Sequence, residues 1–233
     1  MIIPALSVIT AVYRNADTVE ELFARVAATL DNAGLGFEMI FVNDVCPAGS
    51  DAPLVRLAAL EPRVRVITNP TNLGQDRSLA LGLRACKGHT VVLLDADLQD
   101  APEAIPQLVN HLTSTASEAV FAGRRGAYES RGRLATSFLY KRTLALLTSL
   151  PPDAGLFVAL SRRMVDTLNR QRTTCPWLLP RLATSGLPLA STPLVRLPRA
   201  HGRSAYGVWS RLRKGASSVL WTLVLCMRPA EIQ

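Results

Sequence analysis

The stretch VVLLDADLQD, residues 91–100, decides the expected fold. Its first four residues are apolar and two are β-branched, which is typical of a buried strand in a parallel sheet. Asp95 and Asp97 follow directly, and they would lie at the carboxyl edge of that sheet, where open α/β folds bind ligands. Carboxylate oxygens at such an edge suit Mg²⁺ or Mn²⁺. Alternatively, Asp97 only caps the helix that opens near Pro102.

Strand and helix signals alternate through the first half of the chain. Short apolar runs predict strands over 6–13, 37–42, 64–67 and 90–94, and amphipathic runs predict helices over 18–30, 53–60 and 79–86. This alternation is typical of βαβ units. We therefore expect an α/β, Rossmann-like fold with a mainly parallel central sheet and helices on both of its faces.

The alternation of strand and helix signals becomes less regular after Asp100. We expect a helix over 102–112, a strand over 118–122, a basic glycine-punctuated loop over 123–133, a long helix over 134–150 and a turn at 151–155. Paired prolines at the start of that turn cannot continue the preceding helix. No repeat and no clean boundary of a second domain is visible.

The amino-acid composition limits the classes of molecule that the protein is expected to bind. The chain has 233 residues, of which 48% are hydrophobic and 19% charged, so it can build a sizeable core. Its formal net charge of +8 favours an anionic partner: nucleic acid, a phosphorylated substrate or an acidic membrane surface. Only 6% of the residues are aromatic and no basic run is interleaved with rings, so nucleic acid is the weakest of the three.

Compartment signals favour the cytoplasm. The four cysteines lie far apart without a C-x-x-C pair, which supports neither zinc nor a disulfide framework. The N-terminus shows no signal peptide, and no apolar run reaches the roughly 18 residues of a membrane span. The longest candidate, Ala216–Met227, is too short and contains polar residues.

Three further positions could bind a ligand or take part in catalysis. Asp44 follows the second predicted strand and could accept a hydrogen bond from a nucleobase or a ribose, although an ordinary turn aspartate is the better-supported alternative. Gly74 either precedes a helix whose first amides could face an anion or is an ordinary glycine at the entry to a helix, and Asp76 and Arg77 could be its solvated first turn. Asp153, in the turn Pro-Pro-Asp-Ala-Gly, is either a positioned base or an Asx turn.

Basic residues gather in two regions of the second half. Arg124, Arg125, Arg131 and Arg133 flank one loop and could bind phosphates, or they form a solvated face. A second group, from Arg196 to Lys214, precedes the apolar C-terminal run. That segment predicts either a helix lying in a membrane interface or an amphipathic helix packed on the domain.

Together these segments resemble the family 2 glycosyltransferases, which are nucleotide-diphosphosugar enzymes of the GT-A fold. The resemblance is strongest to the polyprenyl-phosphate branch, with its dolichol-phosphate mannose synthases and undecaprenyl-phosphate sugar transferases. The motifs that carry it appear in family order, at 8–13, 41–44, 72–75, 95–103, 152–155, 161–163 and 202–206.

The resemblance implies an inverting, metal-dependent transfer of a sugar from a nucleotide-diphosphate donor to an acceptor, in this branch a polyprenyl phosphate. It implies nucleotide-sugar-binding roles for Thr10, Tyr13, Asp44, Gln75, Asp95 and Asp97. Asp97 and Gln99 would hold Mg²⁺ or Mn²⁺, and Asp153 would be the catalytic base. Phosphates of donor or acceptor would be bound by Arg124, Arg125, Arg131, Arg199, Ser204 and Tyr206.

The implied organisation is a GT-A domain over 1–205 and a C-terminal amphipathic helical extension over 206–233. We expect a cytoplasmic protein at the inner face of the membrane, with a homo-oligomer as an alternative use of its apolar C-terminal strip. Asn43, Leu156 and Ala205 depart from the family pattern, where relatives often have Asp, an acid and Lys.

Three rival functions stay open. The acceptor could be a soluble or glycan hydroxyl, or the chain could be a catalytically inactive peripheral-membrane scaffold of the same fold. A nucleotidyltransferase would also use paired carboxylates and a metal, but residues 13–16 lack the glycine-rich phosphate loop that it needs.

Overall fold

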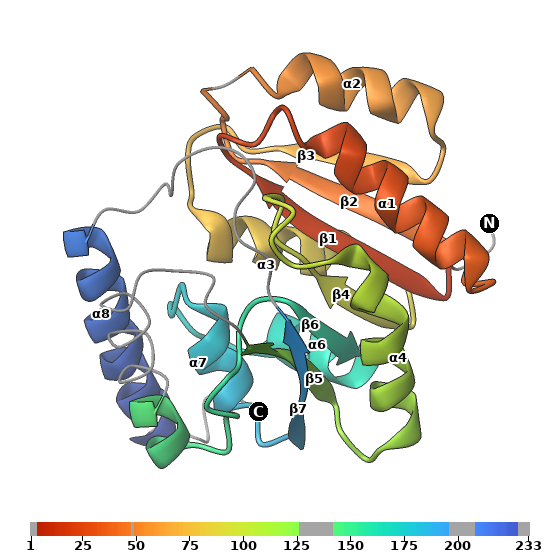
Figure 1. The fold of residues 1–233 in the computed structure, drawn as a ribbon. Coiled ribbons are helices and arrows are strands. Elements are labelled where there is room, and N and C mark those ends of the chain that lie inside the picture. The colour runs from red at the N-terminus through yellow and green to blue at the C-terminus, as the bar shows by residue number, and fades with distance from the viewer. Residues whose placement is uncertain (1–3, 48, 126–141, 196–207, 228–233) are drawn as a thin grey trace.

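A seven-stranded sheet forms the centre of the protein (Figure 1). The structure is a computed structural model, and it describes residues 4–47, 49–125, 142–195 and 208–227. The strands are β1 (Leu6–Val12), β2 (Phe37–Asn43), β3 (Val64–Thr68), β4 (Thr90–Leu93), β5 (Ala119–Arg125), β6 (Val158–Ser161) and β7 (Leu189–Val195). They lie in the order β3-β2-β1-β4-β6-β5-β7.

Helices cover both faces of this sheet (Figure 1). They are α1 (Val19–Asn32), α2 (Asp51–Leu60), α3 (Gln75–Ala85), the 3₁₀ turn η1 (Pro102–Ala104), α4 (Ile105–Ser114), α6 (Arg162–Arg170), α7 (Leu178–Ala183) and α8 (Val208–Met227). Residues 142–147 are also helical. One apolar core lies between the sheet and α1, α2 and α4, and a second lies between the sheet and α3, α6 and α7.

Strand pairing confirms the mainly parallel sheet. β1 runs parallel to β2 and β4, and β2 runs parallel to β3. Neighbouring residues of β1 alternate between the two cores: Val8 faces the first and Ile9 the second, and both are fully buried. The antiparallel strand β6 sits between β4 and β5, and β5 pairs parallel with β7.

Several boundaries of strands, helices and loops differ from those predicted from the sequence or lie outside the described residues. The predicted loop over 123–133 is wrong for its first three residues, because β5 continues to Arg125 by pairing with β7; residues 126–133 lie outside the described ranges. The helix that contains 79–86 begins at Gln75, directly after Gly74, so Asp76 lies in its first turn as expected. The expected boundary at 205 also lies outside the described residues.

A buried carboxylate strengthens the amino-terminal edge of the sheet. Glu38 accepts hydrogen bonds from the Ser7 hydroxyl (2.7 Å), the Lys87 backbone N–H (2.6 Å) and the Arg65 guanidinium (3.0 Å). Burial alone would raise the pKa of the Glu38 carboxyl, but these three donors together hold its pKa below the ordinary value.

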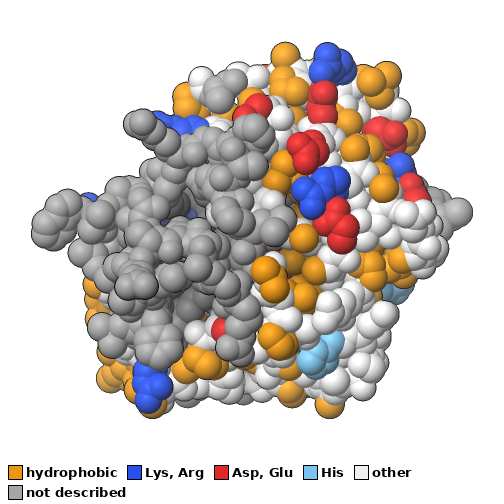
Figure 2. All heavy atoms as spheres, viewed as in Figure 1, with side chains coloured by type: hydrophobic (Ala, Val, Ile, Leu, Met, Phe, Trp, Pro, Cys, Tyr) orange, Lys and Arg blue, Asp and Glu red, His pale blue; other side chains and the backbone are white. Residues whose placement is uncertain are grey.

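The surface over α1 and α2 mixes both signs of charge (Figure 2). Arg25 pairs with Glu103 at 2.8 Å, and Arg56 pairs with Glu20. Exposed pairs of this kind contribute little to stability. This surface therefore mixes both signs of charge and is not a concentrated basic patch.

The C-terminal helix α8 packs on α7 with a partly polar face. Ser218, Thr222 and Leu225 are buried, and the Thr222 hydroxyl donates to the Ser218 carbonyl at 2.9 Å. The packed helix that the sequence offered as one alternative is therefore present. Among the described residues, no helix combines the length and apolar character needed to cross a bilayer.

Candidate active site

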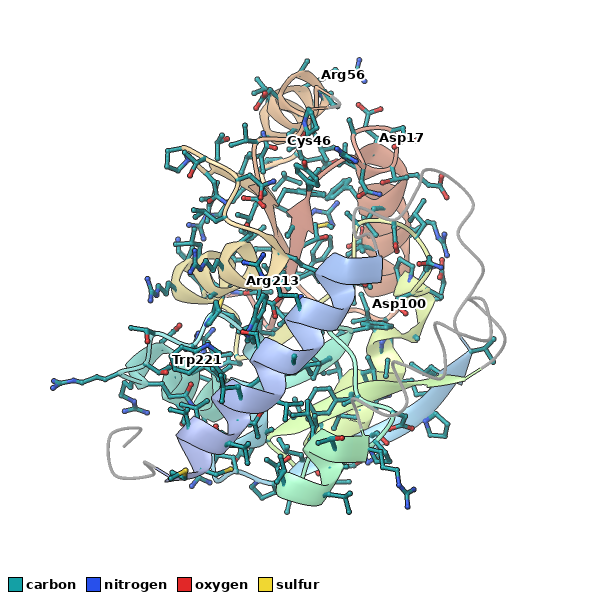
Figure 3. All side chains as sticks on the ribbon, turned by 90° about the vertical axis from the view of Figure 1, so that its left-hand side faces the viewer. Asp17, Cys46, Arg56, Asp100, Arg213 and Trp221 are labelled. Atoms are coloured by element: carbon teal, nitrogen blue, oxygen red, sulfur yellow. The ribbon has the colours of Figure 1, made fainter. Side chains whose placement is uncertain are left out.

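The carboxyl ends of β1 and β4 define a topological switch point. From β1 the chain continues to β2 and β3 on one side, whereas β4 pairs on the other side of β1. The chain segments that leave two such strands separate and create a crevice, which is where open α/β sheets bind ligands. Asp17, Cys46 and Asp100 all lie on this face of the molecule, which α8 crosses (Figure 3).

Asp44 organises one side of this crevice. Its carboxylate is 1% exposed and accepts from Asn69 Nδ2 (2.8 Å), Leu73 N (2.7 Å) and Gly74 N (2.8 Å). Gly74 has φ of +82°, a conformation that L side chains rarely adopt, and it directly precedes α3. Asp44 thus fixes the loop 69–74 and the start of α3.

Asp95 is tied to the same helix. Gln75, the first residue of α3, donates from Nε2 to Asp95 Oδ1 at 2.6 Å. Two residues that the sequence predicted to bind the nucleotide-sugar are therefore brought together across 20 positions of sequence. The side chains of both are only partly buried.

Residues 96–100 form a tight, largely buried turn after β4. Asp97 is 8% exposed, and its Oδ1 accepts from the Gln99 backbone N–H at 3.2 Å. Leu98 has a positive φ of 57°, which is unusual for a branched side chain and costs of order 1–3 kcal/mol. The Thr18 hydroxyl donates to the Ala96 carbonyl at 2.6 Å and holds the turn against the start of α1.

The chemistry of these side chains fits a hard divalent cation. Asp95, Asp97 and Gln99 offer only oxygen acceptors from their carbonyl and carboxylate groups, which is the preference of Mg²⁺ and Mn²⁺. No group of three or more His, Cys, Asp or Glu side chains gathers in a metal-binding arrangement within the described ranges. An ion held by one or two carboxylates would complete its coordination with water and substrate phosphates, as Mg²⁺ commonly does.

Asp153 lies on the other side of β4. Its turn leads into β6, and its carboxylate packs directly over Gly123 of β5. A Cβ atom at Gly123 would stand 2.3 Å from Asp153 Oδ2 and 2.8 Å from Cγ. Glycine at position 123 is therefore a condition for the observed position of Asp153.

The other predicted site residues divide into four groups. Thr10 is fully buried within β1, and its hydroxyl makes no hydrogen bond to any described residue. Tyr13 follows β1 half exposed, with the Arg14 guanidinium 5.4 Å from its ring centroid. The backbone of Arg124 and Arg125 closes β5. The remaining four, Arg131, Arg199, Ser204 and Tyr206, lie outside the described residues.

Two supporting residues were missed at the sequence level. Asn69 follows β3 just as Asp44 follows β2, so the rule that polar residues mark strand ends could have found it. Gly123 gave no such signal, because its role depends on a contact with Asp153, which is distant in sequence. Asp76 was expected to be solvated, and that expectation is wrong: it is 5% exposed.

The chain belongs to glycosyl transferase family 2. The sequence model of that family matches residues 7–168, which span β1 to α6 and include Asp44, Asp95, Asp97 and Asp153. The match covers well over half of the chain.

Curated relatives extend the similarity to the C-terminus. An undecaprenyl-phosphate 4-deoxy-4-formamido-L-arabinose transferase of Aeromonas hydrophila is 30% identical over 238 residues, which cover 99% of this chain and 70% of the relative. An uncharacterized glycosyltransferase of Bacillus subtilis is 26% identical over 210 residues, covering 89% of this chain. The chain spans only 65% of the length of that relative.

A solved structure has the same fold. Glucosyl-3-phosphoglycerate synthase from Mycobacterium tuberculosis, crystallised with Mn²⁺, uridine diphosphate and phosphoglyceric acid, superposes with a TM-score of 0.70. The two chains are 20% identical, and the match covers 96% of this chain and 78% of that one. This likeness identifies the fold as that of GT-A glycosyltransferases, as the sequence predicted.

Proposed function

We propose that the protein transfers a sugar from a nucleotide-diphosphate donor to a polyprenyl phosphate, with inversion at the anomeric carbon. The observation that carries the proposal is the pair of carboxylates Asp95 and Asp97 at the switch point, with Gln75 bound to Asp95 at 2.6 Å. Relatives named as undecaprenyl-phosphate transferases, at 29–31% identity, support the choice of acceptor.

Each residue of the crevice has a role in this proposal. Asp44 and Tyr13 would line the nucleoside pocket. By accepting hydrogen bonds from amides of the loop 69–74, Asp44 would also keep that wall of the pocket in place. Asp95 and Asp97 would hold Mn²⁺ or Mg²⁺, with Gln99 as a further ligand. When bound, the ion supplies positive charge beside the diphosphate as it departs.

The reaction is a single displacement. An acceptor oxygen forms a bond to the anomeric carbon as the bond from that carbon to the diphosphate breaks, and the nucleoside diphosphate leaves. A phosphate acceptor is already an anion, so Asp153 would orient it and no proton moves. With a hydroxyl acceptor, Asp153 would have to take the proton.

Product analysis tests this proposal. The chain is incubated with a panel of nucleotide-sugars and Mn²⁺, with and without undecaprenyl phosphate. We expect acceptor-dependent release of a nucleoside diphosphate, lost in Asp97→Ala and kept in the control Asp166→Ala, a half-exposed aspartate of α6. Release of pyrophosphate would indicate a nucleotidyltransferase instead, and turnover only with a hydroxyl acceptor would overturn the lipid substrate.

The acceptor also implies contact with a membrane surface, and we propose that α8 makes it. Leu220, Leu223 and Met227 recur along one side of α8 and are exposed, Leu220 at 63% and Met227 at 81%. Leu146 and Leu147 of the neighbouring helical residues 142–147 are exposed too, and the Cys226 thiol lies 3.9 Å from the Leu147 carbonyl. This helix thus buries the hydroxyl groups of Ser218 and Thr222 and exposes three apolar side chains, which suits an interfacial position.

Co-sedimentation with vesicles separates membrane contact from a homo-oligomer. We expect salt-sensitive binding to vesicles that contain anionic lipid, weakened in Leu220→Glu and unchanged in the control Val55→Glu, an exposed apolar residue of α2. A stable dimer that binds no vesicles, and that Leu220→Glu dissociates, would show that the strip is a subunit interface.

A further inference from the structure

Asp76 joins three helices in the interior of the protein. It is the second residue of α3, and its Oδ1 accepts from the Leu178 backbone N–H, at the start of α7, at 3.1 Å. Its Oδ2 pairs with the ammonium group of Lys214 of α8. A carboxylate in the first turn of a helix is favoured by the helix dipole, and here it is additionally paired and nearly excluded from water.

Lys214 belongs to a compact contact between α8 and α7. Its Nζ lies 5.0 Å from the centroid of the Trp177 ring, and Trp177 Nε1 donates to Ser217 Oγ at 3.1 Å. Charge, ring and hydroxyl thus fix one turn of α8 against the start of α7. Lys214 is 138 positions away from Asp76, so this contact depends entirely on the tertiary fold.

The turn of α3 that contains Asp76 also builds the donor crevice. Gln75, its neighbour, donates to Asp95 at 2.6 Å, and the amide of Gly74 donates to Asp44 at 2.8 Å. Hydrogen bonds weaken steeply with distance and misalignment, so a small shift of this turn would weaken both contacts. The position of α8 is therefore mechanically connected to the crevice through Asp76.

We propose that the Lys214–Asp76 pair positions the donor site: docking of α8 on Asp76 holds the first turn of α3 so that Gln75 and Gly74 keep Asp95 and Asp44 in place. In this proposal Lys214 and Asp76 act on the donor site only through Gln75 and Gly74, so both are positioning residues. This inference rests on the proposed function, because it assigns a nucleotide-sugar to that crevice.

The test compares nucleotide affinity with stability in the 233-residue chain. UDP, GDP, ADP, CDP and dTDP are titrated with Mn²⁺ by calorimetry, and the tightest is used for all variants. Asp76→Asn keeps an acceptor for Leu178 but removes the charge, and Lys214→Met removes the other partner. The control Arg213→Met removes a charge from the adjacent, exposed position of the same helix.

We expect Asp76→Asn and Lys214→Met each to weaken nucleotide binding by about tenfold or more, which corresponds to about 1.4 kcal/mol. The double variant should lose little more than either single variant, because both remove one interaction. Lys214→Arg should restore most of the affinity, and Arg213→Met should stay within about twofold of wild type.

Two outcomes would overturn this inference, and they differ from failure of the proposed function. Wild-type affinity in Lys214→Met and Asp76→Asn, with only a lower melting temperature, would mean that the pair stabilises the fold without positioning the crevice. Equal losses in Arg213→Met would mean that general charge is responsible. If wild type bound none of the five nucleotides, the proposed function itself would fail. If Lys214→Met does not fold, the nucleotide affinities of Asp76→Asn and Lys214→Arg are compared instead. Equal, wild-type affinities in these two variants would overturn the inference.

Discussion

Replacing Asp44 with asparagine should damage both stability and nucleotide binding. The carboxylate accepts three N–H groups at 2.7–2.8 Å while only 1% exposed. The amide of an asparagine side chain keeps one acceptor oxygen, which is best placed at the Oδ1 position, where two of the bonds converge. Its NH₂ group then faces the Gly74 N–H, so one charge-assisted bond is lost and the part-buried Gly74 N–H is left without that acceptor.

Loss of such a bond costs about 1.5–3 kcal/mol. In a chain of this size, each kcal/mol changes the melting temperature by about 2–4 °C, so we expect Asp44→Asn to melt roughly 3–12 °C lower. Nucleotide affinity should fall as well, because Gly74 and the first turn of α3 lose their anchor. Calorimetric melting and Mn²⁺-dependent nucleotide titration measure the two effects.

Asp166 of α6 supplies the control for this variant, since Asp166→Asn removes the same charge from a half-exposed side chain whose ion-pair partner is Arg162 rather than the loop 69–74. Its melting temperature and affinity should stay close to wild type. An Asp44→Asn protein with wild-type melting and wild-type nucleotide affinity would refute the reasoning that Asp44 holds that loop.

Three further outcomes follow from the same contacts. Gly123→Ala should lower kcat at least about tenfold with only a small change in melting temperature. The new methyl group would displace the flexible Asp153 side chain rather than any backbone atom. Unchanged steady-state kinetics would refute a role for position 123. Glu38→Gln should be less stable than wild type near pH 7, and this stability difference should shrink as the pH falls through the lowered pKa of Glu38. The stabilisation by the Glu38 carboxylate is present above the ordinary carboxyl pKa and is lost when the group is protonated. Melting temperatures measured across this pH range test the prediction, and a stability difference that stays constant with pH would contradict it. A thiol reagent at about pH 8 should label Cys226, which is exposed, and spare Cys175, which packs against Leu225 of α8 and whose pKa burial raises to about 11. Mass spectrometry showing both thiols labelled at equal rates would contradict the packing of α8 over Cys175.

The parallel half of the sheet could be predicted because its strands are mostly continuous apolar runs. β1, β2 and β4 are buried on both faces, so their sequences need no alternation to be recognised. The carboxylates at their ends follow from the same reasoning, since parallel strands direct their carboxyl ends to one edge. The sequence alone is therefore enough to place Asp44, Asp95 and Asp97 at the crevice.

The second half could not be predicted in the same way. β6 has four residues and exists because it pairs antiparallel with β4 and β5, a choice that depends on tertiary contacts. β7 is mostly half exposed and contains Pro193, which weakens any strand signal. The register of β5 with β7 extends β5 to Arg125, where the glycine at 123 suggested a loop.

Asp76 shows the limit of local reasoning most clearly. A charged residue in the first turn of a helix is usually solvated, and the adjacent Arg77 is indeed exposed. Asp76 is buried because Leu178 and Lys214, 102 and 138 positions away in sequence, are brought to it by the fold. No periodicity within α3 carries that information.

The central claim is tested most directly by Mn²⁺-dependent binding of a nucleoside diphosphate to the wild-type chain and to Asp97→Ala. We expect calorimetry to find one of UDP, GDP, ADP, CDP or dTDP bound by wild type with Mn²⁺. Binding should be at least about a hundredfold weaker in Asp97→Ala or with the metal chelated, a difference of about 2.7 kcal/mol. Wild-type binding that persists unchanged in Asp97→Ala, or no binding of any of the five nucleotides to wild type, would contradict the claim.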